Sequence, residues 1–176
     1  MTANAPIKKI AVLGAESTGK TWLCEKLAAY FNTVWVPEYA REYFNNSDIY
    51  NYNLNDLVVI ARRQLEMEEE AAQHAQKLLF CDTTLITLKI WAELEFQSCP
   101  EFIAGNISAG SYHHYLITDN DIPWQKDALR QNKHSRELLL ELNIKEVQKT
   151  GRPYSIISGG EEMRLLNSLK VLDGLL

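Results

Sequence analysis

Residues 14–21 read GAESTGKT, and this stretch decides the fold. It matches the phosphate-binding pattern GxxxxGK[S/T] at every fixed position. The apolar run IKKIAVL precedes it at residues 7–13, and residues 20–31 are rich in helix formers. The sequence therefore predicts a strand, a glycine-bounded loop and a helix in that order, which is the setting in which this pattern binds phosphate.

The predicted loop has the chemistry of a triphosphate site. Its glycines let backbone N–H groups face the β-phosphate, and the positive end of the following helix adds to the attraction. We expect Lys20 to bridge the β- and γ-phosphates and Thr21 to place its hydroxyl on Mg²⁺. The alternative is a glycine-rich turn with a solvated lysine, which the flanking strand and helix argue against. The residues expected to bind ATP here are Gly14, Ala15, Glu16, Ser17, Thr18, Gly19, Lys20, Thr21 and Trp22.

The rest of the chain alternates short apolar runs with helical patterns. Further strands are predicted at residues 33–36, 78–81, 114–118 and 154–157. Helices are predicted at residues 54–76, with Asn55 or Asp56 as a cap, and at 85–96, 138–147 and 161–172. This alternation indicates an α/β fold: a P-loop NTPase three-layer sandwich with a five-stranded parallel sheet. We expect a single domain over residues 1–176, with a helical lid at about residues 120–140.

Two carboxylates follow predicted strands. Asp82 comes directly after an apolar strand, as a Walker-B acid does, and is expected to hold Mg²⁺ directly or through water. The alternative, which is compatible with that role, is an N-cap of the next helix. Glu38 lies just past residues 33–36 and is expected to orient a substrate hydroxyl or accept its proton, with Tyr39 and Arg41 as substrate contacts. Its alternative is a surface cap beside Arg41 or Glu42.

The predicted lid carries two arginines. Arg130 ends the stretch TDNDIPWQKDALR at residues 118–130, and Arg136 follows six residues later. Arginines near the phosphates neutralise charge on the transferred group, so we expect Arg130 to be catalytic and Arg136 to bind the nucleotide. The alternative is that both arginines pair with helix acids in solvent.

Trp124 lies in the same stretch, between a proline and polar residues. No apolar period surrounds it, so it fits a core less well than Trp35 or Trp91. A flat indole in a cleft suits an aromatic ring of a substrate, and a charged pyridinium ring would gain cation–π attraction. The alternative is a tryptophan that packs the base of the lid.

Composition limits the partners. The 176 residues include 18 Lys plus Arg against 23 Asp plus Glu, and no dense basic block suggests nucleic acid. No signal-like leader begins the chain, and the charge-free stretch at residues 102–118 is too polar to span a bilayer, so we expect a cytoplasmic protein. Cys24, Cys81 and Cys99 lack CxxC spacing and are expected to be reduced core thiols.

Together these motifs resemble a known family, the ribosylnicotinamide kinase domain of the NadR proteins, which are grouped with AAA-like P-loop ATPases of NAD metabolism. The similar segments span nearly the whole chain in order, and residues 97–112 fit least well. They are GAESTGKT at 14–21, VWVPEYAREY at 34–43, LFCDTTLITLKIW at 79–91, TDNDIPWQKDALRQN at 118–132 and GRPYSIISG at 151–159.

The resemblance implies a kinase that uses MgATP to phosphorylate the 5′-hydroxyl of nicotinamide riboside, giving nicotinamide mononucleotide. It implies that Glu38 and Asp82 serve the reacting hydroxyl or the metal, without dividing these tasks between them. It also implies a pyridine-nucleoside and lid region at Asp121, Trp124, Asp127 and Arg130. We expect a stand-alone kinase module without adenylyltransferase or DNA-binding parts.

Two other functions stay open on the sequence. One is a P-loop kinase for another nucleoside or small metabolite, because a phosphate loop says little about the acceptor. The other is a nucleotide-gated NTPase binding module, which would hydrolyse ATP without an acceptor. Neither the oligomeric state nor the choice between ATP and GTP follows from these residues.

Overall fold

The computed structural model describes residues 6–107, 112–125 and 136–175. Within them, five parallel strands form one sheet in the order β2-β3-β1-β4-β5. The strands are β1 (Lys8–Gly14), β2 (Trp35–Val36), β3 (Leu78–Asp82), β4 (His114–Thr118) and β5 (Tyr154–Ile157). The predicted five-stranded parallel sheet is confirmed, and only β2 is shorter than the sequence pattern indicated.

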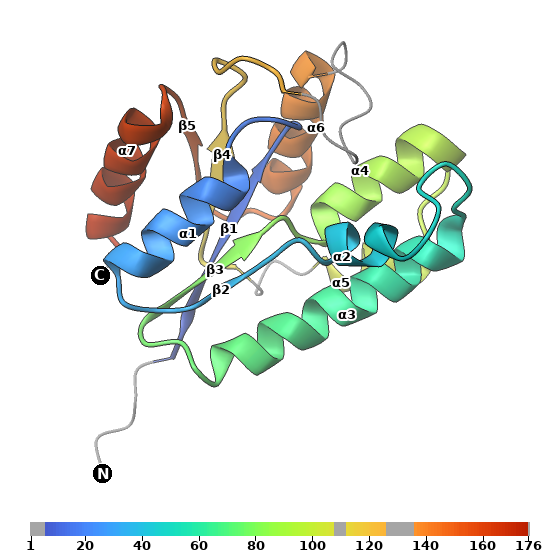
Figure 1. The fold of residues 1–176 in the computed structure, drawn as a ribbon, viewed down its shortest axis with the longest axis horizontal. Helices are drawn as coiled ribbons and strands as arrows, with labels where there is room; N and C mark the ends of the chain where they lie inside the picture. The colour runs from blue at the N-terminus through green and yellow to red at the C-terminus, as the bar shows by residue number, and fades with distance from the viewer. Residues whose placement is uncertain (1–5, 108–111, 126–135, 176) are drawn as a thin grey trace.

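Helices cover both faces of this sheet (Figure 1). On one face pack α1 (Lys20–Tyr30) and α7 (Glu161–Asp173), against side chains such as Ile10 and Val12 of β1. The alternate residues Ala11 and Leu13 face the other side and meet α4 and α6. The predicted three-layer sandwich is therefore confirmed.

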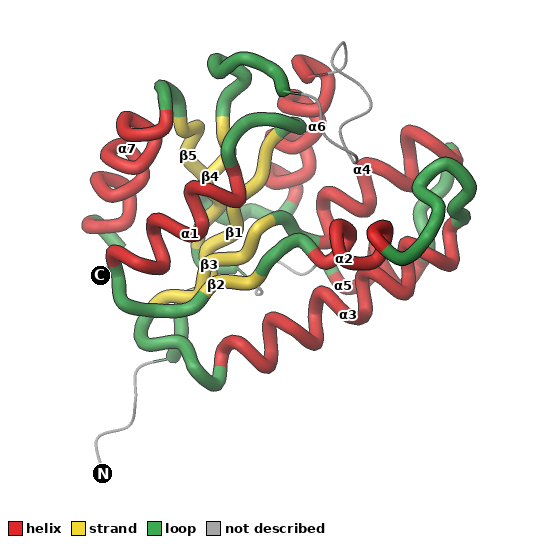
Figure 2. The backbone as a smooth tube through the Cα atoms, viewed as in Figure 1, coloured by secondary structure: helices red, strands yellow, loops and turns green. Residues whose placement is uncertain are grey.

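Three helices of the described residues pack on the second face. They are α3 (Leu54–Ala72), α4 (Leu85–Phe96) and α6 (Arg136–Lys149). Two short helices, α2 (Tyr39–Asn45) and α5 (Glu101–Asn106), lie beside α3 and α4 in a separate apolar cluster (Figure 2). Helices of six or seven residues give little periodic signal, and the sequence did not predict them.

Helix α3 begins at Leu54, as predicted, but its N-cap lies two residues before the first of the caps expected for it. Asn53 is the N-cap, and its side chain accepts a hydrogen bond from the Asn55 backbone N–H at 2.8 Å. The Asp56 carboxylate accepts from the Asn53 backbone N–H at 2.8 Å, which completes a capping box. Asp56 therefore takes part in capping as expected, whereas Asn55 as a cap was wrong.

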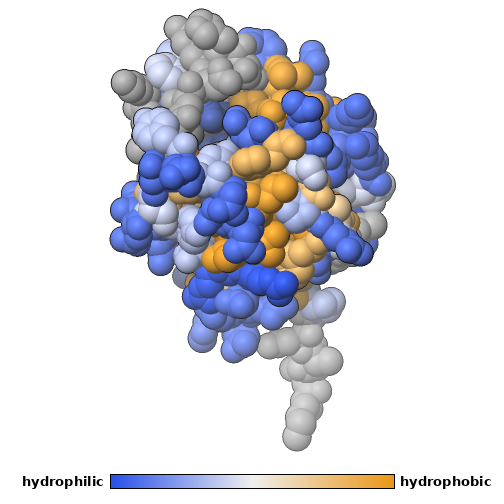
Figure 3. All heavy atoms as spheres, turned by 90° about the vertical axis from the view of Figure 1, so that its right-hand side faces the viewer, coloured by the Kyte–Doolittle hydropathy of each residue, from blue (hydrophilic) through white to orange (hydrophobic). Residues whose placement is uncertain are grey.

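The surface and the thiols show the rest of the chain's chemistry. At the end of the molecule where α2 to α5 lie, apolar side chains are visible between hydrophilic ones (Figure 3). No helix among residues 6–107, 112–125 and 136–175 is long and apolar enough to cross a membrane.

The three cysteines are free thiols. Cys24 and Cys81 are buried, and burial raises the pKa of both, whereas Cys99 is half-buried.

Candidate active site

The loop at residues 14–21 begins where β1 and β4 come unusually close. Gly14 ends β1 with φ at 139°, and a Cβ atom built on it would lie 2.3 Å from Thr118 Oγ1 and 2.7 Å from the Thr118 carbonyl oxygen. Only glycine fits both this backbone angle and this gap. Thr118, at the end of β4, therefore fixes where the loop starts.

Buried hydroxyl groups brace the loop from inside. Thr118 Oγ1 lies 3.0 Å from the Leu13 carbonyl oxygen and 2.6 Å from Thr18 Oγ1. Thr18 Oγ1 in turn lies 2.8 Å from the Ala15 carbonyl oxygen, and both threonines are fully buried. The loop thus keeps a defined shape through contacts within the protein.

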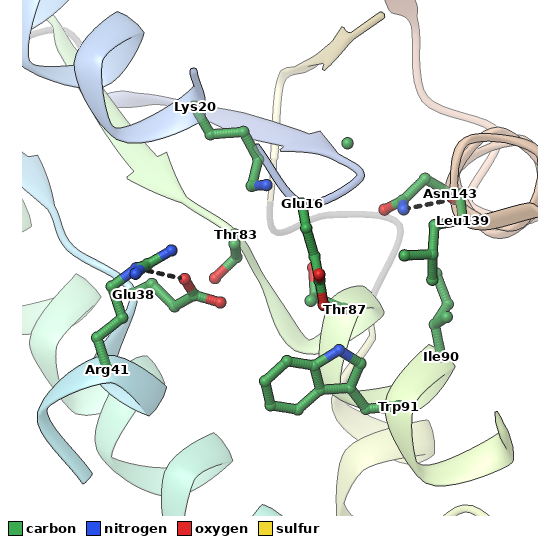
Figure 4. A pocket seen from close by; sticks show the side chains of 11 residues that line it. Glu16, Lys20, Glu38, Arg41, Thr83, Thr87, Ile90, Trp91, Leu139 and Asn143 are labelled. Carbon is green, nitrogen blue, oxygen red and sulfur yellow. Dashed lines mark hydrogen bonds and ion pairs between the residues drawn. The ribbon is translucent and has the colours of Figure 1, made fainter. Parts of the chain in front are cut away.

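Lys20 opens α1 directly after Gly19, whose φ is 77°. Its Nζ donates a hydrogen bond to the Ala15 carbonyl oxygen at 2.8 Å. Burial lowers the pKa of Lys20, while the nearby carboxylates of Asp82 and Glu38 raise it. Figure 4 shows the Lys20 ammonium pointing into the space that Glu16 and Glu38 border.

Asp82 lies at the end of β3 and is almost fully buried. Its Oδ2 accepts a hydrogen bond from Thr21 Oγ1 at 2.5 Å, whereas its Oδ1 is buried without a partner among the described residues. The pKa of Asp82 is raised to about 6, mainly by burial and next by the negative charge of Glu38. The N-cap of α4 is Thr84, which accepts from the Ile86 N–H at 3.1 Å, so the alternative role of Asp82 as that cap was wrong.

The pair Thr21 and Asp82 fits a magnesium ion. A hydroxyl and a carboxylate are the hard oxygen ligands that Mg²⁺ prefers, and one carboxylate oxygen has no partner among the described residues. No group of three or more His, Cys, Asp or Glu able to hold a metal occurs in the described part of the chain. An ion here would complete its coordination with phosphate oxygens and water.

Glu38 lies between β2 and α2, facing the same space. Arg41 Nε donates to Glu38 Oε2 at 3.0 Å, and the Glu38 side chain is only 12% exposed. Glu38 occupies the N-cap position of α2 but makes no side-chain capping bond. The Tyr39 N–H donates to Gln64 Oε1 at 2.9 Å, and its ring packs near Tyr43. Glu38 and Arg41 therefore reach the site, whereas the Tyr39 ring packs within the helical cluster.

Two hollows flank the loop and meet at shared residues. The α1–α7 hollow, the larger of the two, is lined by Ser17, Thr18, Gly19, Lys20, Thr21, Trp22, Arg41, Ile122, Pro123, Gln125, Gly160 and Glu161. The α4–α6 hollow is lined by Gly14, Glu16, Lys20, Glu38, Arg41, Thr83, Thr87, Ile90, Trp91, Leu139 and Asn143 (Figure 4). Lys20 and Arg41 border both.

Sequence reasoning missed most of the α4–α6 hollow. Trp91 was expected in the core, yet it is half-buried and lines this hollow together with Thr87 and Ile90 of the same helix. Leu139 and Asn143 come from α6 on the opposite side. The available signal was helical spacing: Thr87 and Trp91 lie four residues apart in α4 and so share a face.

Asp121 is bound within the protein. Its Oδ2 accepts from the Gly159 N–H, and its Oδ1 accepts from Arg164, which also donates to the Ile157 carbonyl at 2.8 Å. Arg164 is fully buried and reaches the Asp119 carbonyl at 2.9 Å. These contacts tie the segment after β4 to the start of α7. Asp121 lines neither hollow, and its predicted contact with the substrate stays a prediction.

The remaining predicted lid residues divide into two groups. Trp124 is half-buried and its Nε1 has no partner among the described residues, while its neighbours Pro123 and Gln125 line the α1–α7 hollow. Arg136 is buried and donates to the Ile122 carbonyl at 3.0 Å. The alternative, in which Arg136 pairs with a helix acid in solvent, was therefore wrong. Asp127 and Arg130 lie outside the described residues.

Comparisons with known proteins agree with this geometry. A family model described as an AAA domain matches residues 9–164. The trifunctional NAD biosynthesis/regulator protein NadR of Escherichia coli (strain K12) is 29% identical over 145 residues, which cover 77% of this chain and 35% of that protein. The chain thus spans about a third of the length of this relative.

Solved structures show the same fold. A crystal structure of NadR protein in complex with NR has a TM-score of 0.83 and 22% identity, covering 96% of this chain and 51% of that one. A second, in complex with NAD and AMP-PNP, has a TM-score of 0.77 and 22% identity, covering 96% and 49%. At this identity the likeness supports the architecture, and it agrees with the predicted P-loop fold.

Proposed function

Because this chain belongs to the AAA domain family, we propose that it is a kinase that transfers the γ-phosphoryl group of ATP to the 5′-hydroxyl of nicotinamide riboside. One observation carries the proposal: a hollow beside the phosphate loop and a separate hollow beside α4 and α6 share Lys20 and Arg41. Two reactants bound in these hollows would meet at a lysine and an arginine. That is what in-line phosphoryl transfer needs.

The α1–α7 hollow suits the nucleotide. Residues 17–22 of the loop and of α1 line it, and Gly160 with Glu161 borders it from the start of α7. Lys20, which now bonds the Ala15 carbonyl, would exchange that neutral partner for a charged phosphate oxygen. Thr21 and Asp82 would hold Mg²⁺, which would supply positive charge beside the phosphates.

The division of work between the carboxylates follows from where each one faces. Asp82 is bonded to Thr21 and does not line the α4–α6 hollow, whereas Glu38 does. Glu38 is therefore the group that would accept a hydrogen bond from the acceptor's 5′-hydroxyl and receive its proton during transfer. Arg41, bonded to Glu38 and bordering both hollows, would hold that carboxylate and stabilise the transferred phosphoryl.

The acceptor proposal rests on the α4–α6 hollow and on the similar NadR proteins, whose names refer to NAD biosynthesis and to a complex with NR. The indole of Trp91 forms one wall, and Glu16 and Glu38 bring acidic groups to the same space (Figure 4). An aromatic face beside acidic groups suits a positively charged pyridinium ring. We assign to Trp91 the stacking role that the sequence suggested for Trp124. Such an enzyme would act on a small molecule in the cytoplasm.

Product analysis tests this proposal. Purified protein would be incubated with MgATP and nicotinamide riboside, and mass spectrometry would follow nicotinamide mononucleotide while a coupled assay follows ADP. We expect both products in a one-to-one ratio. ADP formed at the same rate without the riboside would favour an NTPase, and ADP formed only with another nucleoside would favour a different kinase.

A further inference from the structure

The α4–α6 hollow contains two polar atoms that no part of the proposed transfer uses. Asn143 Oδ1 and Thr87 Oγ1 are both buried and have no hydrogen-bond partner among the described residues. Both residues line this hollow, one from α6 and one from α4. Buried polar atoms are nearly always paired, so two unpaired atoms on residues that line one hollow point to a ligand.

The orientation of the Asn143 amide is set by its helix. Nδ2 donates a hydrogen bond to the Leu139 carbonyl oxygen at 2.8 Å, one turn earlier in α6. A carbonyl oxygen only accepts, so the nitrogen must face it and the amide oxygen must face away. Only 3% of Asn143 is exposed, and Figure 4 shows its side chain at the end of the hollow farthest from Glu38. Its oxygen can therefore accept a hydrogen bond from an N–H or O–H group of a ligand.

Thr87 offers the complementary group. A threonine inside a helix commonly bonds the carbonyl one turn earlier, but Thr87 Oγ1 makes no such bond. Its hydroxyl is thus available as a donor. Trp91 lies four residues later on the same face of α4, so the hydroxyl and the indole line the hollow together.

The surroundings of these atoms make the missing bonds costly. Ile90 and Leu139, which line the same end of the hollow, are apolar and almost fully buried. An apolar wall offers the two polar atoms no substitute partner, and a ligand that pairs only one of them leaves the other unsatisfied. Such an arrangement favours ligands that present a donor and an acceptor side by side.

We infer that Asn143 and Thr87 recognise the carboxamide group of the acceptor's ring and make the enzyme select a carboxamide over a carboxylate. The amide NH₂ donates to Asn143 Oδ1, and the amide oxygen accepts from the Thr87 hydroxyl. A carboxylate has no donor for Asn143 Oδ1 and would share the hollow with the acidic residues Glu16 and Glu38. The inference rests on the proposed function and names the specificity residues of that same site.

Acceptor competition tests the inference. The ratio of kcat/KM for nicotinamide riboside to that for nicotinate riboside would be measured for the unmodified protein, Asn143→Leu and Thr87→Val. We expect at least about a tenfold preference for the carboxamide in the unmodified protein, falling several-fold or more in each variant. The KM for ATP should not change, because neither residue lines the α1–α7 hollow.

A matched control comes from α5. Asn106 Nδ2 donates to the Phe102 carbonyl at 2.7 Å, one turn earlier as in Asn143, but Asn106 is exposed and lies outside the α4–α6 hollow. Asn106→Leu should leave the acceptor ratio unchanged. If Asn143→Leu does not fold, the acceptor ratio of Thr87→Val decides the test, because valine has nearly the shape of threonine, with a methyl group in place of the hydroxyl.

The outcomes separate this inference from the proposed function. An unmodified protein that phosphorylates neither riboside while binding MgATP overturns both. An unmodified protein that phosphorylates nicotinamide riboside, with an acceptor ratio that neither variant changes, overturns the inference alone and leaves the kinase proposal standing.

Discussion

The two hollows that meet at Lys20 are built in opposite ways. Half of the residues that line the α1–α7 hollow come from one continuous stretch, residues 17–22, whose shape depends on backbone angles and on buried threonines. The α4–α6 hollow is assembled from single side chains on separate elements, among them Glu38, Trp91 and Asn143. In the proposed function, the first would recognise what all nucleoside triphosphates share, and the second would fit one kind of acceptor.

This difference explains what each hollow tolerates. A loop that binds phosphate through its backbone and one lysine keeps its function only if its local sequence is kept. A hollow made of scattered side chains can change its ligand through single substitutions without disturbing the loop. Changes beside the loop should therefore stop transfer to every acceptor, and changes beside α4 and α6 should alter which acceptor is used.

The largest effect is expected for Lys20→Ala. Loss of the charge that faces the β- and γ-phosphates should lower kcat by about a thousandfold or more for any acceptor, because this charge acts in a desolvated site. A coupled ADP assay measures it, with Lys26→Ala, an exposed position on the same helix, as the control. Full activity of Lys20→Ala would show that Lys20 of this loop takes no part in phosphoryl transfer.

Asp82→Asn should separate function from stability. Activity should fall about a hundredfold or more, because the proposed magnesium ligand loses its charge. Burial raises the pKa of Asp82 to about 6, so the ionised carboxylate disfavours the folded state above that pH. The neutral variant should therefore be more stable by about 1–3 kcal/mol at pH 8.

The stability difference between Asp82→Asn and the unmodified protein should depend on pH. It should shrink as the pH falls through 6 and disappear only below the ordinary aspartate pKa of 3.8, where the aspartate is protonated in both folded and unfolded chains. Chemical denaturation in a metal-free buffer measures it at each pH. A variant less stable than the unmodified protein at pH 8 would contradict a desolvated Asp82.

Gly14→Ala should damage the loop through the backbone. Its added Cβ would lie 2.3 Å from Thr118 Oγ1, and φ at 139° strains any other residue, so we expect a loss of about 2–4 kcal/mol in unfolding free energy. MgATP binding should weaken as well. Gly105→Ala is the control, because nothing lies within 4 Å of its Cβ position. Equal stability of both variants would show that β4 does not confine the loop.

Trp91→Leu should have the smallest effect and the most selective one. We expect the KM for nicotinamide riboside to rise about tenfold while the KM for ATP stays the same, because Trp91 lines only the α4–α6 hollow. Trp124→Leu, measured beside it, should change the riboside KM less. A larger rise in the riboside KM for Trp124→Leu than for Trp91→Leu would assign the stacking role to Trp124.

How much the sequence predicted follows the same division. The loop, the five strands and the positions of Glu38 and Asp82 were predictable, because they depend on local patterns and on the rule that strand ends converge. Thr87, Trp91 and Asn143 were not, because the approach of α4 and α6 depends on packing between distant segments. The ion pair between buried Arg164 and exposed Asp121 joins residues 43 positions apart, and no local pattern marks it.

The proposed transfer requires two different ligands to occupy adjoining hollows at the same time. Calorimetric titration of nicotinamide riboside into protein saturated with Mg²⁺ and a non-hydrolysable ATP analogue measures this. We expect one riboside to bind per chain without displacing the nucleotide, and Trp91→Leu to weaken this binding. Displacement of the nucleotide by the riboside, or no binding of the riboside at all, would contradict the proposed transfer.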